Sequence, residues 1–388
     1  MRITVNSTTL AAQTGWVAKT LPTRPAIPVL AGMRLDIQPD QVTLIGTDYD
    51  TWASVSMDAD TDDTGTWVLP GRTLAALAAT LPPGRSVVLE QDGARVRIQC
   101  GSVRASLLTL PAEDFPALPD RPGPVGRVEA DALAAAVTRV DTAASDDATL
   151  DLLTGIHLQL SQDGLVATAS DRYRVARAAI DWEPALADDA GGPVEVLVPH
   201  QALTQAVRGL AGHVEIGLHI IPGADSATQL CLHDGDRRLD VGLISYDSYL
   251  PVDKLLDISG KVTGTVRVAT ADLTAALQRV RTLAARETPV LLVLGTGGHL
   301  EVATGGGEDA EGADTVEADY DGDQLTVAFA PAFLADLLAT IRAERVRLDL
   351  TGPHTPALAT PANEDGEDRF WHMIMPIRQP ATSTAVAA

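Results

Sequence analysis

The chain has 388 residues, which suits two or three domains with cores of ordinary size. Apolar residues make up 45% and charged residues 21% of it, as in globular proteins, and this composition excludes a disordered chain. The 29 basic and 52 acidic residues give a formal net charge of −23, so the chain as a whole repels a phosphate backbone, and any binding of nucleic acid must depend on where basic side chains gather.

The two cysteines, Cys100 and Cys231, both fall in strand-like runs, so we expect a reduced compartment and no disulfide. The first residues have the pattern of a strand and lack the apolar core of a signal peptide. No apolar run reaches the length that spans a membrane. We therefore expect a cytoplasmic protein without a membrane partner.

The first third of the chain predicts one strand, a Ser/Thr-capped helix, and then mostly strands with a second helix among them. The helices are expected at Thr8–Thr20 and Arg72–Leu81, the second with Leu74, Leu77 and Leu81 on one face. The strands are expected at Arg2–Val5, Pro28–Ile37, Gln41–Thr47, Thr51–Met57, Thr66–Leu69, Ser86–Glu90, Arg95–Cys100 and Val103–Leu108.

Two further stretches of this kind follow, each after a connector. The first connector is the proline-rich segment Pro111–Pro124, and the second is Tyr246–Gly260. The later helices are expected at Asp131–Ala144, His200–Leu210, Ala271–Ala284 and Pro331–Ala343, and a last strand at Trp371–Ile377. Leu133, Val137 and Val140 form one apolar stripe, and Leu273, Leu277 and Val280 form another. The tail, Gln379–Ala388, is small and polar and is expected to be disordered.

The most informative stretch is Leu165–Ile180, LVATASDRYRVARAAI, which predicts a hairpin with a polar corner at Ser170-Asp171-Arg172. A turn needs only turn-forming residues, so two arginines and a tyrosine at the corner exceed what the backbone requires.

Val42–Asp58 matches this hairpin without a gap when Asp48 is laid on Asp171, and the segment Leu69–Leu74 returns at Val198–Leu203 and, with its proline displaced, at Ala330–Leu334. Repeats on this scale predict three units of one plan, each with antiparallel sheets and two helices, in an α+β fold. The expected boundaries are 1–124, 125–258 and 259–378, with 379–388 as the tail.

The predicted helices carry most of the basic charge that can gather on one surface. These residues are Lys19, Arg72, Arg139, Arg208, Arg279, Arg281 and Arg342, with Arg24 just beyond the first helix. A single arginine of this kind is more often a solvated residue of a helix. Recurrence in every unit favours a common basic surface.

With its three repeats, the chain resembles the bacterial sliding clamp, the beta subunit of DNA polymerase III, from Met1 to Arg378. The resemblance rests on SDRYRVA at 170–176, HMIMPIR at 372–378, LPTRPAIPVLAG at 21–32 and TLPAEDFPALP at 109–119. It implies three tandem clamp repeats in a head-to-tail homodimeric ring around double-stranded DNA, bound without regard to sequence. It also implies contacts with DNA polymerase III alpha subunit, the clamp loader and repair proteins.

The resemblance transfers a DNA contact to Arg24, and more loosely to Lys19, Arg72, Arg139, Arg208, Arg279 and Arg342. It also implies a pocket for short peptide motifs of partner proteins, in which flexible methionines suit varied partners. The matching pocket positions are Leu153, Ser170, Arg172, Tyr173, Arg174, Val175, Lys254, Leu255, Pro289, Ala330, Phe333, Met373, Ile374, Met375, Pro376 and Ile377.

The chain departs from the family pattern at three places. Ser170 stands for a customary threonine, Ala330 for an asparagine, and Tyr246–Leu255 lacks the usual Gly-x-Phe-Pro order. These departures leave open a specialised clamp copy with an altered pocket, for instance one that resists a clamp-directed inhibitor. A protein-interaction hub that does not encircle DNA is the other open reading.

No catalytic constellation, cofactor motif or metal-ligand spacing is evident, so we expect a processivity factor and not an enzyme. The segment Gly305–Asp309 lacks the lysine of a phosphate-binding loop, and its acids lack a calcium-loop pattern. The rival reading is an acidic enzyme with an active site between units, and the absence of paired catalytic residues argues against it.

Overall fold

The computed structural model describes residues 1–185, 193–220, 226–250, 262–283, 288–295, 297–304, 312–362 and 369–378. The chain divides into two compact units, one of Met1–Ala134, Trp182–Gly192 and Gln201–Ser245, and one of Ala135–Asp181, Pro193–His200 and Tyr246–Ala388. The predicted site residues Lys254 and Leu255 and the predicted tail, 379–388, lie outside the described residues. Among the described helices, none combines the length and apolar character that a membrane span needs.

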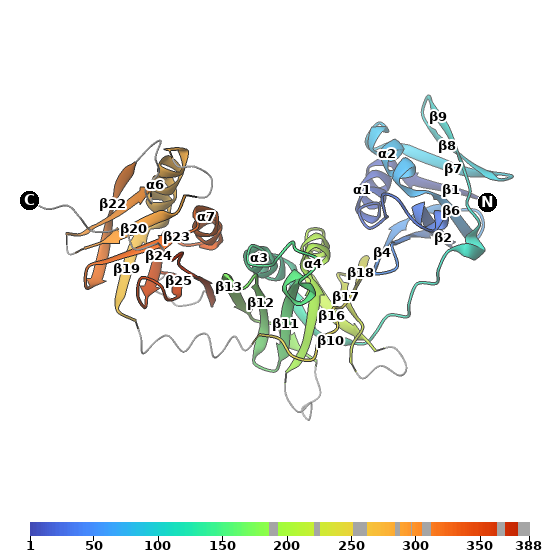
Figure 1. Cartoon of the computed structure of the whole chain (residues 1–388). Helices are drawn as coiled ribbons and strands as arrows, with labels where there is room; N and C mark the ends of the chain where they lie inside the picture. Colours follow the sequence, from blue (N-terminus) through green and yellow to red (C-terminus); the bar gives the residue numbers. More distant parts are fainter. Residues whose placement is uncertain are drawn as a thin grey trace, which may run out of the picture. The chain divides into compact units, whose positions relative to one another are not determined.

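The first unit contains two antiparallel sheets (Figure 1), with the orders β5-β1-β7-β8-β9 and β14-β10-β16-β17-β18-β4-β3-β2-β6. Their strands are β1 (Arg2–Asn6), β2 (Gly32–Gln38), β3 (Gln41–Thr47), β4 (Thr51–Asp58), β5 (Asp60–Thr61), β6 (Gly65–Pro70), β7 (Ser86–Asp92), β8 (Arg95–Cys100), β9 (Val103–Leu108), β10 (Pro124–Glu129), β14 (Glu183–Pro184), β16 (His213–His219), β17 (Gln229–His233) and β18 (Arg237–Gly242).

The second unit contains one antiparallel sheet with the order β15-β11-β12-β13-β26-β25-β24-β19-β22-β21-β20-β23. Its strands are β11 (Gly155–Ser161), β12 (Gly164–Ser170), β13 (Arg174–Ile180), β15 (Val194–Pro199), β19 (Gly264–Ala269), β20 (Val290–Leu294), β21 (His299–Thr304), β22 (Ala313–Gly322), β23 (Leu325–Phe329), β24 (Arg345–Leu350), β25 (Ala357–Pro361) and β26 (Phe370–Ile374).

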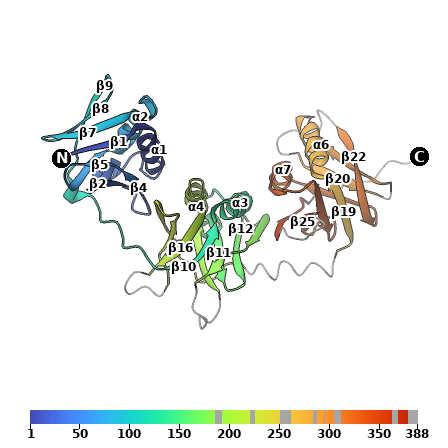
Figure 2. The same ribbon diagram turned by 180° about the vertical axis from the view of Figure 1, so that it is seen from behind.

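The described helices are α1 (Ser7–Val17), α2 (Gly71–Thr80), α3 (Ala130–Asp141), α4 (His200–Val207), α6 (Thr270–Leu283) and α7 (Pro331–Thr340), with short 3-10 helices η1 (Pro28–Ala31), η2 (Ala112–Asp114) and η3 (Asp151–Thr154). Helices α1 and α2 pack together, as do α6 and α7 (Figures 1 and 2).

The predicted apolar stripes form the buried faces of the helices. In α3 and α6 every predicted stripe residue is buried, whereas in α2 Leu77 is only half-buried and Ala78 takes its place in the core. Apolar side chains three and four positions apart share one face of a helix, so local periodicity alone identifies this part of the core.

Sheet hydrogen bonding passes from one predicted domain into the next. Strand β4 pairs with β18, with Thr51 opposite Val241, and β13 pairs with β26, with Arg174 opposite Ile374. The nine-stranded sheet therefore combines strands of the first and second predicted domains, and the twelve-stranded sheet combines strands of the second and third. For this reason the two compact units divide the chain differently from the three repeats.

The repeat predicted from the sequence is also present as structure. η1, β2 and β3 correspond in order and length to η3, β11 and β12, with Thr47 and Ser170 at equivalent strand ends. The α+β class and the antiparallel sheets are confirmed.

Several bounds differ from the expectations, among them those of the first helix, of the strand expected at Pro28–Ile37 and of the last strand. The first helix ends at Val17, and its cap is Asn6, whose side-chain oxygen accepts hydrogen bonds from the backbone of Thr8 and Thr9. The expected strand Pro28–Ile37 begins with the 3-10 turn η1, because proline suits the first turn of a helix. The last strand ends at Ile374, just before Pro376, which has no N–H for a sheet.

Candidate functional site

The corner between β12 and β13 is held by side chains that bond to its own backbone. The Ser170 hydroxyl donates to the carbonyl oxygen of Arg174 over 2.8 Å and accepts the N–H of Arg172 over 3.2 Å. One oxygen of Asp171 accepts the N–H groups of Tyr173 and Arg174 at 2.9 and 3.0 Å. Short polar side chains of this kind replace water around a turn, so Ser170 and Asp171 fix the direction of the residues that follow.

The equivalent corner of the first repeat has the same bonds. Thr47 donates to the carbonyl oxygen of Thr51 over 2.8 Å, as Ser170 does to Arg174, and Asp48 accepts the N–H of Thr51 over 2.7 Å. Both corners place a large residue in the left-handed region, with φ of 80° at Tyr49 and at Arg172. Such a conformation costs a non-glycine residue about 1–2 kcal/mol. Glycine would suit the turn better, so the turn alone does not account for a large side chain at these two positions.

The end of the chain lies beside this corner. In β26, Met373 stands opposite Val175, and the N–H of Met375 donates to the carbonyl oxygen of Tyr173 over 2.8 Å. The N–H of Ile377 donates to the carbonyl oxygen of Ala328 over 2.8 Å. The corner and the end of the described chain, far apart in the sequence, thus lie side by side.

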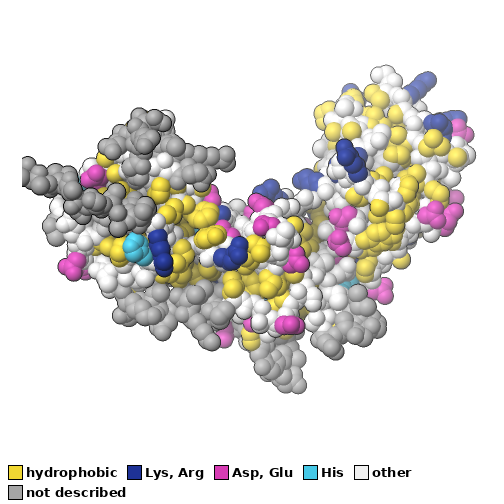
Figure 3. Space-filling model, in the orientation of Figure 1, with side chains coloured by type: hydrophobic (Ala, Val, Ile, Leu, Met, Phe, Trp, Pro, Cys, Tyr) yellow, Lys and Arg dark blue, Asp and Glu magenta, His cyan; other side chains and the backbone are white. Residues whose placement is uncertain are grey.

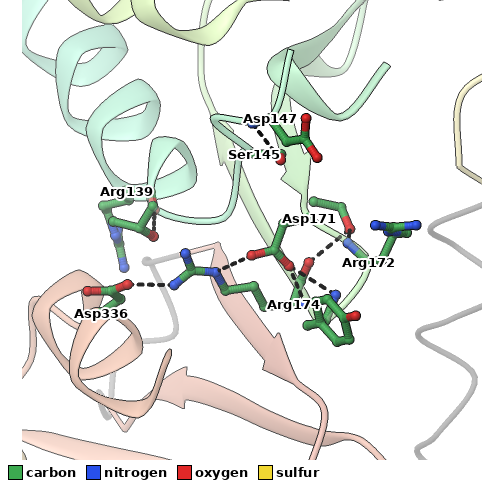
Figure 4. Close-up of polar contacts among 10 residues, drawn as sticks. Arg139, Ser145, Asp147, Asp171, Arg172, Arg174 and Asp336 are labelled. Carbon is green, nitrogen blue, oxygen red and sulfur yellow. Dashed lines mark hydrogen bonds and ion pairs between the residues drawn. The ribbon is translucent and has the colours of Figure 1, made fainter. Parts of the chain in front are cut away.

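Arg174 is the best-anchored side chain at the corner (Figure 4). Its Nε lies 2.8 Å from a carboxylate oxygen of Asp171, and its Nη1 lies 2.6 Å from a carboxylate oxygen of Asp336. The guanidinium carbon lies 4.4 Å from the ring centroid of Phe333, and the Tyr173 ring stacks on Phe333 with centroids 6.3 Å apart. Two carboxylates and a ring hold Arg174 in one orientation.

Sequence reasoning missed Asp336. It lies three residues after Phe333 on α7, so both side chains project from one face of that helix, and this spacing was the available signal.

The apolar residues expected at this site divide into buried and exposed ones. Leu153, Val175, Met373 and Ile374 are buried, whereas Met375 is 39% and Tyr173 57% exposed. The site therefore combines the exposed side chains of Met375 and Tyr173 with buried apolar residues. Such a surface suits an apolar side chain of a partner.

The remaining predicted residues of this site have different positions. Pro289, Ala330 and Phe333 are half-buried, Pro376 is buried, and Ile377 is half-buried. The Ser170 hydroxyl is already engaged within the turn, so Ser170 shapes the corner. Arg172 is exposed beside it.

The basic residues that the resemblance makes DNA contacts fall into two groups. Six are exposed: Lys19, Arg24, Arg72, Arg208, Arg279 and Arg342. Two of these have partners in the chain, since Arg72 donates to the carbonyl oxygen of Leu21 and the Nε of Arg279 lies 2.6 Å from Asp314. On the face drawn in Figure 3, basic side chains form no continuous patch, and several lie beside acidic ones.

Arg139 differs from the other six because it is buried. Its Nε donates to the carbonyl oxygen of Thr340 over 2.9 Å, and its guanidinium carbon lies 3.7 Å from the ring centroid of Phe370. Arg139 thus links α3 to α7 and β26. The expectation that its side chain faces solvent as a DNA contact is corrected by this burial.

One cluster has metal-ligand chemistry that the sequence spacing did not reveal. Ligand atoms of His219, Cys231 and Asp240 lie within 4.8 Å of one another. Arg238 holds both oxygens of Asp240, at 3.1 Å from Nε and 2.7 Å from Nη2, and so supplies the positive charge there. Burial, and then the charge of Asp240, raise the pKa of the Cys231 thiol to about 12, which keeps it protonated. The negative charge of Asp240 in this cluster is therefore neutralised by the guanidinium of Arg238.

Family models of the DNA polymerase III beta subunit match three successive parts of the chain: the N-terminal domain at residues 1–119, the central domain at 127–245 and the C-terminal domain at 260–378. The chain belongs to the bacterial sliding clamp family. The resemblance and the three-repeat clamp fold inferred from the sequence are thereby confirmed.

Individual relatives agree with this family. The beta sliding clamp of Streptomyces coelicolor is 34% identical over 381 residues, covering 97% of this chain and 99% of that protein. The beta sliding clamp homolog GriR of Streptomyces muensis is 32% identical over 386 residues, with the same coverage of 97% and 99%.

Solved structures share the fold. The crystal structure of the DNA polymerase III subunit beta from Pseudomonas aeruginosa has a TM-score of 0.87 at 24% identity, covering 98% of this chain and 100% of that one. A sliding clamp of the same organism bound to griselimycin has a TM-score of 0.88 at 23% identity and the same coverage.

Proposed function

We propose that this protein is a DNA sliding clamp, a processivity factor that encircles duplex DNA and acts without a catalytic site of its own. The observation that carries the proposal is the match of all three clamp domains, in order, along one chain. A role in replication also accords with the cytoplasmic location expected from the sequence.

The charge distribution supports binding by enclosure. The six exposed residues expected to contact DNA, on a chain of net charge −23, supply few phosphate contacts, and their binding weakens as salt rises. A closed ring does not depend on such contacts to stay on circular DNA, and weak contacts let it slide.

The test loads the protein onto nicked circular DNA with a bacterial clamp loader and washes it with high salt. We expect the protein to remain on the circle and to leave when the circle is cut after loading. Equal loss from circular and linear DNA would contradict encirclement.

We further propose that the ring is a head-to-tail homodimer. Strand β9 ends the five-stranded sheet and β23 ends the twelve-stranded sheet, and Leu108 on β9 is 52% exposed. A strand at the end of a sheet presents unpaired backbone groups, and an exposed leucine there favours coverage by another chain.

The third part of the proposal is that the corner Ser170–Val175 and the segment Met373–Ile377 bind short peptide motifs of DNA polymerase III alpha subunit, the clamp loader and repair proteins. The anchored Arg174 and the apolar base beside exposed Met375 and Tyr173 support it. A motif with a glutamine, a spaced leucine and a terminal aromatic or leucine residue would set its apolar end against Leu153, Val175 and Met375.

A further inference from the structure

The first repeat has its own version of the peptide-binding surface. Because η1, β3 and β4 correspond to η3, β12 and β13 residue by residue, Val29 and Leu30 correspond to Leu152 and Leu153, and Trp52 corresponds to Val175. Leu153 and Val175 belong to the apolar part of the site at the second corner, and Leu152 precedes Leu153 in η3.

The two versions differ in coverage at one position. Leu152 is 41% exposed, whereas its counterpart Val29 is 5% exposed. Leu153 and Val175 are buried, as are their counterparts Leu30 and Trp52. The side chain that covers the first version is Phe115, which belongs to one buried cluster with Val29, Ile45, Trp52 and Val68. Leu110, Ala112 and Leu118, from the same connector as Phe115, pack against this cluster.

The connector is fastened on both sides of Phe115. Before it, the N–H of Leu110 donates to the carbonyl oxygen of Val68 in β6 over 2.8 Å. After it, Nη2 of Arg238 donates to the carbonyl oxygens of Pro119 and Asp120 over 2.8 and 3.2 Å. The bidentate pair with Asp240 orients Arg238 for this role, so the buried cluster around Asp240 serves to hold the connector down.

We propose that the connector is an internal ligand: Phe115 occupies, in the first repeat, the surface that takes a partner's peptide in the second repeat. The first surface is thus a latent second site for the same class of ligand, a short extended peptide with an aromatic anchor and a leucine three residues later, as in Phe115 and Leu118. This inference rests on the peptide-binding role proposed for the corner at Ser170–Val175. On this inference, the first surface is closed to a partner's peptide because the connector already covers it.

The test is a calorimetric titration of the full-length protein with a synthetic clamp-motif peptide. Wild type should bind one peptide per chain. Phe115→Ala removes the internal anchor and should raise the stoichiometry to two, while the matched control Glu113→Ala, an exposed residue of the same connector, should stay at one. Leu118→Ala is the milder second variant, for use if Phe115→Ala does not fold by circular dichroism.

A photo-crosslinking group on the peptide locates the additional site. In Phe115→Ala the labelled residues should include 29–31 and 51–58 as well as 170–175, whereas wild type should be labelled only at the second corner. One peptide per chain in the folded variants, with all labels at the second corner, overturns this inference and leaves the proposed function standing. No peptide binding by wild type overturns the proposed peptide role and the inference with it.

Discussion

At the scale of single residues, Arg174 connects the corner to the last helix. Its ion pair with Asp171 is local, whereas its ion pair with Asp336 crosses to α7. The second carboxylate is half-exposed and therefore contributes less than a buried one would.

We expect Arg174→Ala to weaken peptide binding by about 1–2 kcal/mol, because the polar rim loses its donor and Phe333 loses its stacking partner. Asp336→Asn should cost less than about 1 kcal/mol, since Asp171 still orients the arginine. Calorimetry with one clamp-motif peptide measures both, with the distant exposed Glu301→Gln as control. Unchanged affinity in Arg174→Ala would remove this residue from the site.

His372 is a second informative residue, buried in β26 beside the site. Its Nδ1 lies 3.3 Å from the Thr340 hydroxyl, while its Nε2 is buried and has no partner among the described residues. Burial, and then the positive charge of Arg174, lower the pKa of His372 from 6.5 to about 3.

This shift predicts a pH dependence of stability. Between pH 6.5 and about 3 the unfolded chain binds a proton at His372 that the folded chain does not, so the free energy of unfolding falls as the pH falls, by up to about 1.4 kcal/mol per pH unit. The contribution is fully present above pH 6.5. Denaturant unfolding at several pH values measures this. The free energy of unfolding should fall less steeply with falling pH for His372→Leu than for wild type, with exposed His299→Gln as the control variant. Parallel profiles for wild type and His372→Leu would contradict the assignment.

At the scale of elements, one turn design serves several hairpins. In the β17–β18 hairpin, Asp234 accepts the N–H of Arg237 over 2.9 Å, as Asp171 accepts that of Arg174, and the left-handed residue there is Gly235. Glycine takes this conformation without steric cost, so Tyr49 and Arg172 mark corners of this design where a large side chain is retained against that cost.

The segment after β26 is not a strand, and it belongs to the proposed site. Deleting Met375–Arg378 removes the exposed methionine and the hydrogen bonds to Tyr173 and Ala328, so peptide binding should be abolished. The deletion leaves β9 intact and removes one hydrogen bond to β23, at Ala328, so the dimer should largely persist. Peptide calorimetry and light scattering on the same sample check both outcomes, and undiminished peptide affinity would place the site elsewhere.

At the scale of the whole molecule, ring closure requires two chains. We expect light scattering at micromolar concentration to give twice the chain mass. Leu108→Arg puts a charge on the end strand β9 and should shift the protein toward monomer, while the control Ile220→Arg, at another exposed apolar residue, should not. A wild-type protein of single chain mass would count against the ring.

The sequence by itself determined the order of the elements, the repeat and the family. Apolar stripes such as Leu273, Leu277 and Val280 depend on local periodicity, and the corner Ser170–Arg174 forms through bonds between near neighbours, so both are legible along the chain.

Only the tertiary structure decided which of the predicted residues are free to bind. Arg139 has the sequence context of an exposed helix arginine, yet its stacking on Phe370 buries it. Asp336 joins Arg174, and Arg238 joins Asp120, across more than a hundred residues of chain. Contacts of this kind depend on how strands from different repeats pair and on which side chains this pairing brings together. A local sequence pattern does not predict them.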